Sequence, residues 1–229
     1  MTALVLLPGL MCDARLWAPQ EAALKGVEVH HGDMTRADTV QEIASSVLAD
    51  APKTFALAGL SMGGIIAMEV IRQAPERVER LALLDTNPRA EMPEVAALRE
   101  PQIAAARSGN LRSVLRDELK PNYLVDSPQK QGILDICMEM GLDLGPEVFE
   151  RQSRALAARP NQQETLKAYD RPALVLMGRH DKLCPLDRHE LMHDLLPDSE
   201  LVIIEQAGHL PTLEQPEATT AAMQAWLDR

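Results

Sequence analysis

Ser61 stands in the hexapeptide GLSMGG at residues 59–64, which fits the pattern G-x-S-x-G with Gly59 and Gly63. The pattern follows a short apolar run and opens a helical one, a setting typical of a serine held on a sharp turn. The amino end of a helix supplies free N–H groups and a positive field, which favour developing negative charge. Ser61 is therefore a candidate nucleophile, and the alternative is a serine in an ordinary strand-to-helix turn.

A serine hydroxyl needs a general base, and His209 in AGHLPTLEQP is the candidate. His209 follows the last strand-like run, so it should lie at the same edge of the sheet as Ser61. Asp181, in GRHDKLCP, is the candidate acid that orients the imidazole, and the chain order Ser, Asp, His fits this role. Asp85, in LLDTNP at the end of another apolar run, is the alternative acid.

Acyl transfer also needs two N–H groups that bind the oxyanion. We expect one from Met62, the residue after the serine, and the other from the loop LPGLMCD. In that loop Leu10 is the first choice and Met11 the second. Met11 is also expected to line the substrate pocket, whose soft apolar walls suit a small hydrophobic acyl or alkoxy group.

The pentapeptide HELMH at residues 189–193 raises a competing chemistry, because H-E-x-x-H on a helix can bind zinc. His189 and His193 would be ligands and Glu190 the general base. A third ligand could come from Glu205, His209 or Glu214. The apolar side chains of this helix predict that both histidines face solvent instead, so we expect no metal site.

Six short runs have strand character, and several are apolar almost throughout, as in strands that are buried on both faces of a parallel sheet. They are Ala3–Leu7, Val27–His31, Phe55–Leu60, Arg80–Asp85, Ala173–Gly178 and Leu201–Glu205. Helical patterns separate most of them: Leu16–Lys25, Thr39–Ala49, Met62–Gln73, Asp187–Leu196 and Glu214–Leu227. Asp38 and Gln41 predict a capping box at the start of the second helix. This alternation predicts a doubly wound, mostly parallel α/β sheet.

The stretch from about Pro88 to Leu166 breaks the alternation and shows only helical patterns. It predicts a helical insert between the fourth and fifth strands, which could cover the carboxyl edge where ligands bind in open α/β sheets. We therefore predict a core of residues 1–88 and 167–229 and a helical cap of residues 89–166.

The net charge of -11 disfavours nucleic acid and anionic membranes as partners. No apolar run approaches a membrane span, and the first residues lack the basic flank of a signal peptide. Three widely spaced cysteines suggest neither a disulfide framework nor a zinc ribbon. These features predict a cytoplasmic protein, and its oligomeric state stays open.

Four motifs, LLPGLMCD, LAGLSMGG, LMGRHDKLCP and AGHLPTLEQPE, extend over nearly the whole chain. Together they make the sequence resemble the α/β-hydrolase family, in particular small cap-bearing esterases and lactonases related to proline iminopeptidases and to menaquinone-pathway lyases. The sequence departs from the family at Pro8-Gly9, where His-Gly is usual. Its first strand corresponds to the oxyanion strand, so we expect the family's two leading antiparallel strands to be absent.

The resemblance implies a serine hydrolase that cleaves small carboxylic esters through Ser61, His209 and Asp181, without a metal or organic cofactor. The same three residues also serve lactone, thioester and C–C bond hydrolysis, and a lyase reaction. A zinc metalloprotease built on HELMH and a non-catalytic ligand receptor are the remote alternatives. The expected partner is a small molecule with an ester or related acyl group.

Overall fold

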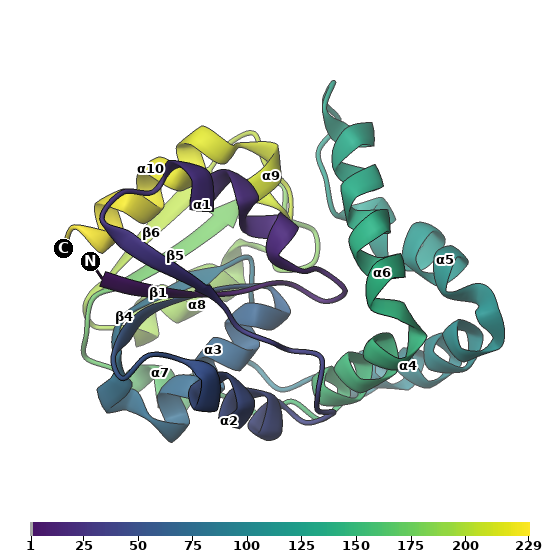
Figure 1. Cartoon of the computed structure of the whole chain (residues 1–229), viewed down its shortest axis with the longest axis horizontal. Helices are drawn as coiled ribbons and strands as arrows, with labels where there is room; N and C mark the ends of the chain where they lie inside the picture. Colours follow the sequence, from purple (N-terminus) through teal and green to yellow (C-terminus); the bar gives the residue numbers. More distant parts are fainter. Residues whose placement is uncertain (1) are drawn as a thin grey trace.

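A computed structural model describes residues 2–229, and its centre is one sheet of six parallel strands (Figure 1). The strands are β1 (Thr2–Leu7), β2 (Val27–His31), β3 (Phe55–Leu60), β4 (Val78–Leu84), β5 (Ala173–Gly178) and β6 (Ser199–Ile204). Their order across the sheet is β2-β1-β3-β4-β5-β6. The order reverses between β1 and β3, and ligands bind beyond the carboxyl ends of strands at such a point. The predicted doubly wound fold is confirmed.

Helices cover both faces of the sheet, because alternate side chains of each buried strand point to opposite sides. Leu4 and Leu6 pack with one layer, whereas Val5 and Leu7 pack with the other. The first layer contains η1 (Ala14–Trp17), α1 (Ala18–Ala23), α9 (Pro211–Glu214) and α10 (Pro216–Leu227). The second contains α2 (Val40–Asp50), α3 (Met62–Gln73), α7 (Gln163–Lys167) and α8 (Leu186–Leu195), with η2 (Pro75–Arg77) after α3. Both layers bury large apolar clusters against the sheet.

Between β4 and β5 the chain forms the predicted helical insert, which Figure 1 shows as an arm beside the sheet. Its elements are α4 (Pro93–Ala105), η3 (Ala106–Asn110), α5 (Leu111–Ser113), η4 (Val114–Leu119), η5 (Lys120–Asn122) and α6 (Lys130–Ala157). Gly145, with φ 80°, breaks the helical path of α6 just before Pro146, so α6 consists of two helical segments that join end to end.

Several helix boundaries differ from the prediction by one or more residues, and two of these differences have a clear local cause. Thr39, not Asp38, caps α2: its hydroxyl accepts from the Glu42 N–H at 3.2 Å and donates to the Glu42 carboxylate. The N-cap therefore lies one residue later than predicted. The last helix, α10, begins at Pro216 rather than at the predicted Glu214, because Glu214 ends the short helix α9 and Gln215 has non-helical backbone angles, φ -139° and ψ 65°. Within residues 2–229, no helix has the length and apolar character that a membrane crossing requires.

Candidate active site

Ser61 forms the turn between β3 and α3 and has φ 55° and ψ -115°, a left-handed conformation that is rare outside glycine. Its N–H donates to the Leu84 carbonyl at 2.9 Å, and its carbonyl accepts from the Thr86 hydroxyl at 2.7 Å. Leu84 ends β4 and Thr86 lies two residues beyond it, so the end of the neighbouring strand holds the strained turn. The strain places the Ser61 side chain at the carboxyl edge of the sheet.

The glycines around the serine are required by close backbone approach. A Cβ at Gly59 would lie 2.3 Å from the Gly63 carbonyl oxygen, and one at Gly63 would lie 2.2 Å from the Leu7 carbonyl oxygen. These contacts are far shorter than carbon and oxygen allow. The G-x-S-x-G pattern therefore lets β1, the serine turn and the start of α3 pack against one another.

Three side chains predicted from the sequence meet at this edge. His209 Nε2 lies 2.9 Å from Ser61 Oγ, and His209 Nδ1 lies 2.8 Å from Asp181 Oδ2. With the proton on Nδ1, the imidazole donates to the carboxylate and Nε2 accepts from the serine hydroxyl. His209 is 2 % exposed and Asp181 is 5 % exposed, so bulk water does not compete for these bonds. This is the geometry in which an imidazole can remove the proton of a serine.

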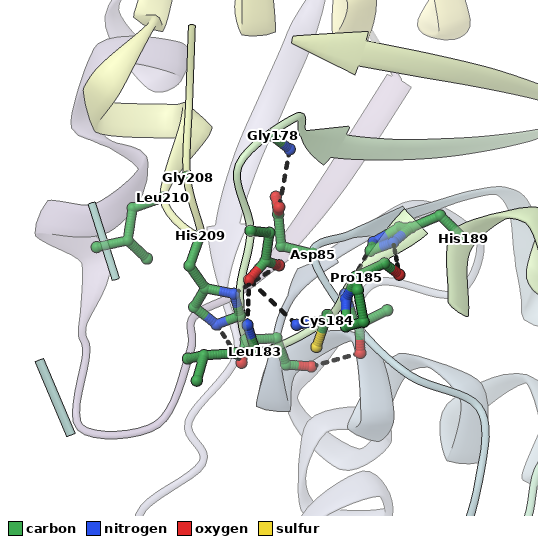
Figure 2. A network of polar contacts seen from close by, with 12 residues as sticks. Asp85, Gly178, Leu183, Cys184, Pro185, His189, Gly208, His209 and Leu210 are labelled. Atoms are coloured by element: carbon green, nitrogen blue, oxygen red, sulfur yellow. Dashed lines mark hydrogen bonds and ion pairs between the residues drawn. The ribbon is translucent and has the colours of Figure 1, made fainter. Parts of the chain in front are cut away.

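The two candidate acids differ in their contacts and charge. Burial raises the pKa of Asp181, but His209 and the N–H groups of Leu183 and Cys184 outweigh it and hold that pKa below its usual value. Burial, then repulsion from Asp181, raises the pKa of Asp85 well above its usual value. In Figure 2, Asp85 Oδ1 accepts from the Gly178 N–H, at 2.9 Å, rather than from the histidine. The structure thus pairs His209 with Asp181, and Asp85 is a buried neighbour that bonds to the backbone of β5 instead.

The loop that carries His209 is held by Glu214, which was considered above only as a possible metal ligand, and by Tyr123, which no motif indicated. The Glu214 carboxylate accepts from the N–H groups of Gly208 at 2.9 Å and Leu210 at 3.0 Å, on either side of the histidine. The Tyr123 carbonyl accepts from the His209 N–H at 2.6 Å, and its ring packs 5.4 Å from the imidazole. Glu214 lies only five residues after His209, so its sequence position could have indicated a role near the histidine. Tyr123 lies in the insert, and nothing in the sequence connects it with His209.

Of the N–H groups expected to bind an oxyanion, two are free. Across residues 2–229, the N–H groups of Leu10 and Met62 have no hydrogen-bond partner, and both residues line the cavity next to Ser61. The Met11 N–H is occupied, because it donates to Gln152 Oε1 of α6 at 2.9 Å. Met11 is 1 % exposed and packs in an apolar cluster with the insert. Met11 was predicted to line the substrate pocket, but it does not line this cavity. Gln152 gave no signal in the sequence.

A cavity of about 380 Å³ opens above Ser61 and His209, between the strand ends and the insert. The core contributes Leu10, Ser61, Met62, Ile65, Thr86, Asn87, Lys182, Leu183, Cys184, Arg188 and His209. The insert and its flanks contribute Glu91, Met92, Val95, Leu98, Arg99, Gln102, Glu118, Leu119, Tyr123, Leu156 and Arg159. Its volume suits a small organic ligand.

The prediction that both HELMH histidines face solvent is wrong for His189, which is fully buried. His189 Nε2 accepts from the Thr86 N–H at 3.3 Å, and burial lowers the pKa of His189 to about 4. His193 instead bonds to the Ser199 hydroxyl at 2.8 Å. Each imidazole therefore already has its own structural contact, and that of His189 braces the turn after β4.

Among residues 2–229, one group of side chains has the ligand types and spacing for a metal ion. It consists of Asp181, Cys184 and His209, whose ligand atoms lie within 4.8 Å of one another. Two of the three already bond to each other, through His209 Nδ1 and Asp181 Oδ2. The group does not include the histidines of HELMH.

The sequence model of the alpha/beta hydrolase family matches residues 4–222 of this chain. Two curated relatives are pimeloyl-[acyl-carrier protein] methyl ester esterases. The relative from Aromatoleum aromaticum is 27% identical, over 82% of this chain and 80% of its own length. The relative from Neisseria meningitidis serogroup C is 26% identical, over 83% of this chain and 77% of its own length.

Solved structures share the fold. A thermophilic esterase from Thermogutta terrifontis, solved with malate bound, has a TM-score of 0.91 and is 28% identical. The alignment covers 100% of this chain and 90% of that one. An enol-lactonase from Burkholderia xenovorans has a TM-score of 0.89 and is 23% identical, with 100% and 92% covered. The similarity to the enol-lactonase concerns the fold alone.

Proposed function

Because the chain belongs to the alpha/beta hydrolase family, we propose that it hydrolyses small carboxylic esters through an acyl-enzyme on Ser61. The observation that carries this proposal is the hydrogen-bond chain from Ser61 Oγ through His209 to Asp181. The curated relatives named above act on a methyl ester, which supports ester hydrolysis as the reaction class.

In the acylation step, His209 Nε2 takes the proton of Ser61 as Oγ attacks the ester carbonyl. The free N–H groups of Leu10 and Met62 hold the oxyanion, and Asp181 stabilises the imidazolium without taking its proton. The C–O bond of the ester then breaks, and the leaving alcohol receives the proton from His209.

Deacylation repeats these roles with water. His209 removes a proton from water as its oxygen attacks the acyl carbon, and the acyl bond to Ser61 breaks. Ser61 Oγ receives the proton back, and the carboxylic acid is released. We also propose that residues 89–166 act as a cap on the core of residues 1–88 and 167–229, because side chains of the insert line the cavity above Ser61.

Turnover of 4-nitrophenyl acetate and butyrate tests this proposal. The wild-type chain should hydrolyse both, Ser61→Ala should abolish the activity, and a chelator should leave it unchanged. Ser45→Ala, at an exposed serine of α2, is the matched control. A metal-dependent hydrolase would show the reverse, with activity stopped by chelation and retained in Ser61→Ala. If neither ester nor lactone panels are turned over, ester hydrolysis is refuted and the alternative of a non-catalytic ligand receptor gains support.

A further inference from the structure

Two arginines share one glutamate in the wall of the cavity above Ser61. Arg99 donates to Glu91 Oε2 at 2.6 Å, and Arg159 donates to Glu91 Oε1 at 3.0 Å. The Glu91 side chain is 4 % exposed and each arginine side chain 12 %. All three residues line the cavity that also contains the Ser61 and His209 side chains.

This cluster has one more positive charge than negative charges. Two guanidinium groups face one carboxylate, and within residues 2–229 the buried Arg99 Nε has no hydrogen-bond partner. Burial lowers the pKa of Arg159, and repulsion from Arg99 lowers it further, although Glu91 acts in the opposite direction. Buried charges in proteins are normally paired, because removal from water is costly. A second anion in the cavity would complete the pairing.

The rest of the cavity wall carries more positive than negative charge. Lys182 and Arg188 also line it, while Glu118 is its other acid. The whole chain carries a net charge of -11, so this local excess of cations does not follow from the overall composition. Apolar side chains, including Val95, Leu98 and Leu156, complete the wall. The cavity thus combines an apolar surface with a cationic cluster and a serine that can attack an ester.

We propose that Arg99 and Arg159 bind a carboxylate of the substrate, so that the preferred substrates are short esters with a free carboxylate remote from the scissile bond. Planar guanidinium groups match the two oxygens of a carboxylate, and such charge-assisted bonds are stronger than neutral ones. The apolar wall contacts the aliphatic chain between the two groups. This inference rests on the proposed function and adds the substrate class.

Matched ester pairs that differ only in charge test the inference. Monomethyl adipate is compared with methyl adipamate, in which a neutral amide replaces the carboxylate. The acetyl ester of 4-hydroxybutyrate and its amide form the second pair, with the charge on the alcohol side. We expect the kcat/KM of the charged member to exceed that of the amide by about tenfold or more in at least one pair. The difference should arise mainly in KM and shrink in high salt.

The quantity to follow in variants is the ratio of kcat/KM for the charged ester to kcat/KM for its amide. Substitutions at the cluster should change this ratio in opposite directions. Arg99→Gln and Arg159→Gln should lower it towards one, whereas Arg99→Lys should retain part of it. Glu91→Gln removes the competing carboxylate and should raise the ratio. Arg154→Gln, on the exposed face of α6 and outside the cavity, is the matched control and should leave the ratio unchanged.

Inhibition by adipate, which carries two carboxylates and no ester, is a second measurement that requires no new ester substrate. Adipate should inhibit hydrolysis of 4-nitrophenyl acetate competitively in the wild type and more weakly in Arg99→Gln and Arg159→Gln. Equal kcat/KM for charged and neutral esters in both pairs would overturn the inference and leave the proposed function intact. A ratio that survives both Gln substitutions would also overturn it. Absence of turnover of every ester would instead refute the proposed function.

Discussion

Acidification from pH 7 to pH 5 should destabilise the protein through one buried imidazole, that of His189. Burial lowers the pKa of His189 to about 4, whereas a histidine in an unfolded chain has a pKa of about 6.5. Between these values the unfolded state binds more protons, so stability falls as the pH falls. With these two pKa values, one site loses about 2 kcal/mol of unfolding free energy between pH 7 and pH 5.

Urea unfolding at several pH values measures this loss, with the fluorescence of the two tryptophans, Trp17 and Trp226, as the signal, since both are buried. His189→Gln keeps an oxygen that can accept from the Thr86 N–H but does not titrate. The difference in unfolding free energy between wild type and His189→Gln should therefore shrink by about 2 kcal/mol on going to pH 5. His180→Gln, at an exposed histidine, is the control. A difference that stays constant with pH would show that the pKa of His189 is not lowered in the folded protein.

Two further substitutions test the elements that position the site. Glu214 Oε2 accepts from the N–H groups of Gly208 and Leu210, and Glu214 Oε1 accepts from the Val125 N–H. In Glu214→Gln an amide NH2 group must therefore face an N–H donor on one side or the other, so kcat for ester hydrolysis should fall at least tenfold. Glu217→Gln, at an exposed glutamate of α10, should match the wild type. Gly63→Ala forces a methyl group against the Leu7 carbonyl, so it should abolish activity and lower the melting temperature. Gly132→Ala, in α6, has open space around the new methyl group and should raise the free energy of unfolding by about 0.5–1 kcal/mol. An active, stable Gly63→Ala variant would contradict the close packing of the serine turn.

The sequence predicted those parts of the molecule that depend on local patterns. Apolar runs located the six strands, and Ser61, Asp181 and His209 each follow a strand, so their meeting at one edge of a parallel sheet could be inferred. The N-cap of α2 was misplaced by one residue, because Asp38 and Thr39 are both good caps and only the structure shows which hydroxyl or carboxylate faces the helix.

Contacts between distant segments could not be predicted in this way. Gln152 reaches the Met11 N–H across 141 positions of the chain, and His189 reaches Thr86 across 103. No spacing rule connects such pairs. The burial of His189 was missed because its apolar neighbours suggested another helix face, whereas the Thr86 N–H supplies the polar partner that makes burial possible. The pairing of Arg99 with Arg159 through Glu91 is of the same kind.

Covalent labelling of the protein shows whether Ser61 is the nucleophile. A fluorophosphonate should add one adduct per chain, and peptide mass spectrometry should place it on Ser61. A substrate ester should slow the labelling, and Ser61→Ala should abolish it. An unlabelled wild-type protein that still hydrolyses esters, or an adduct on another residue with activity lost, would show that Ser61 is not the nucleophile.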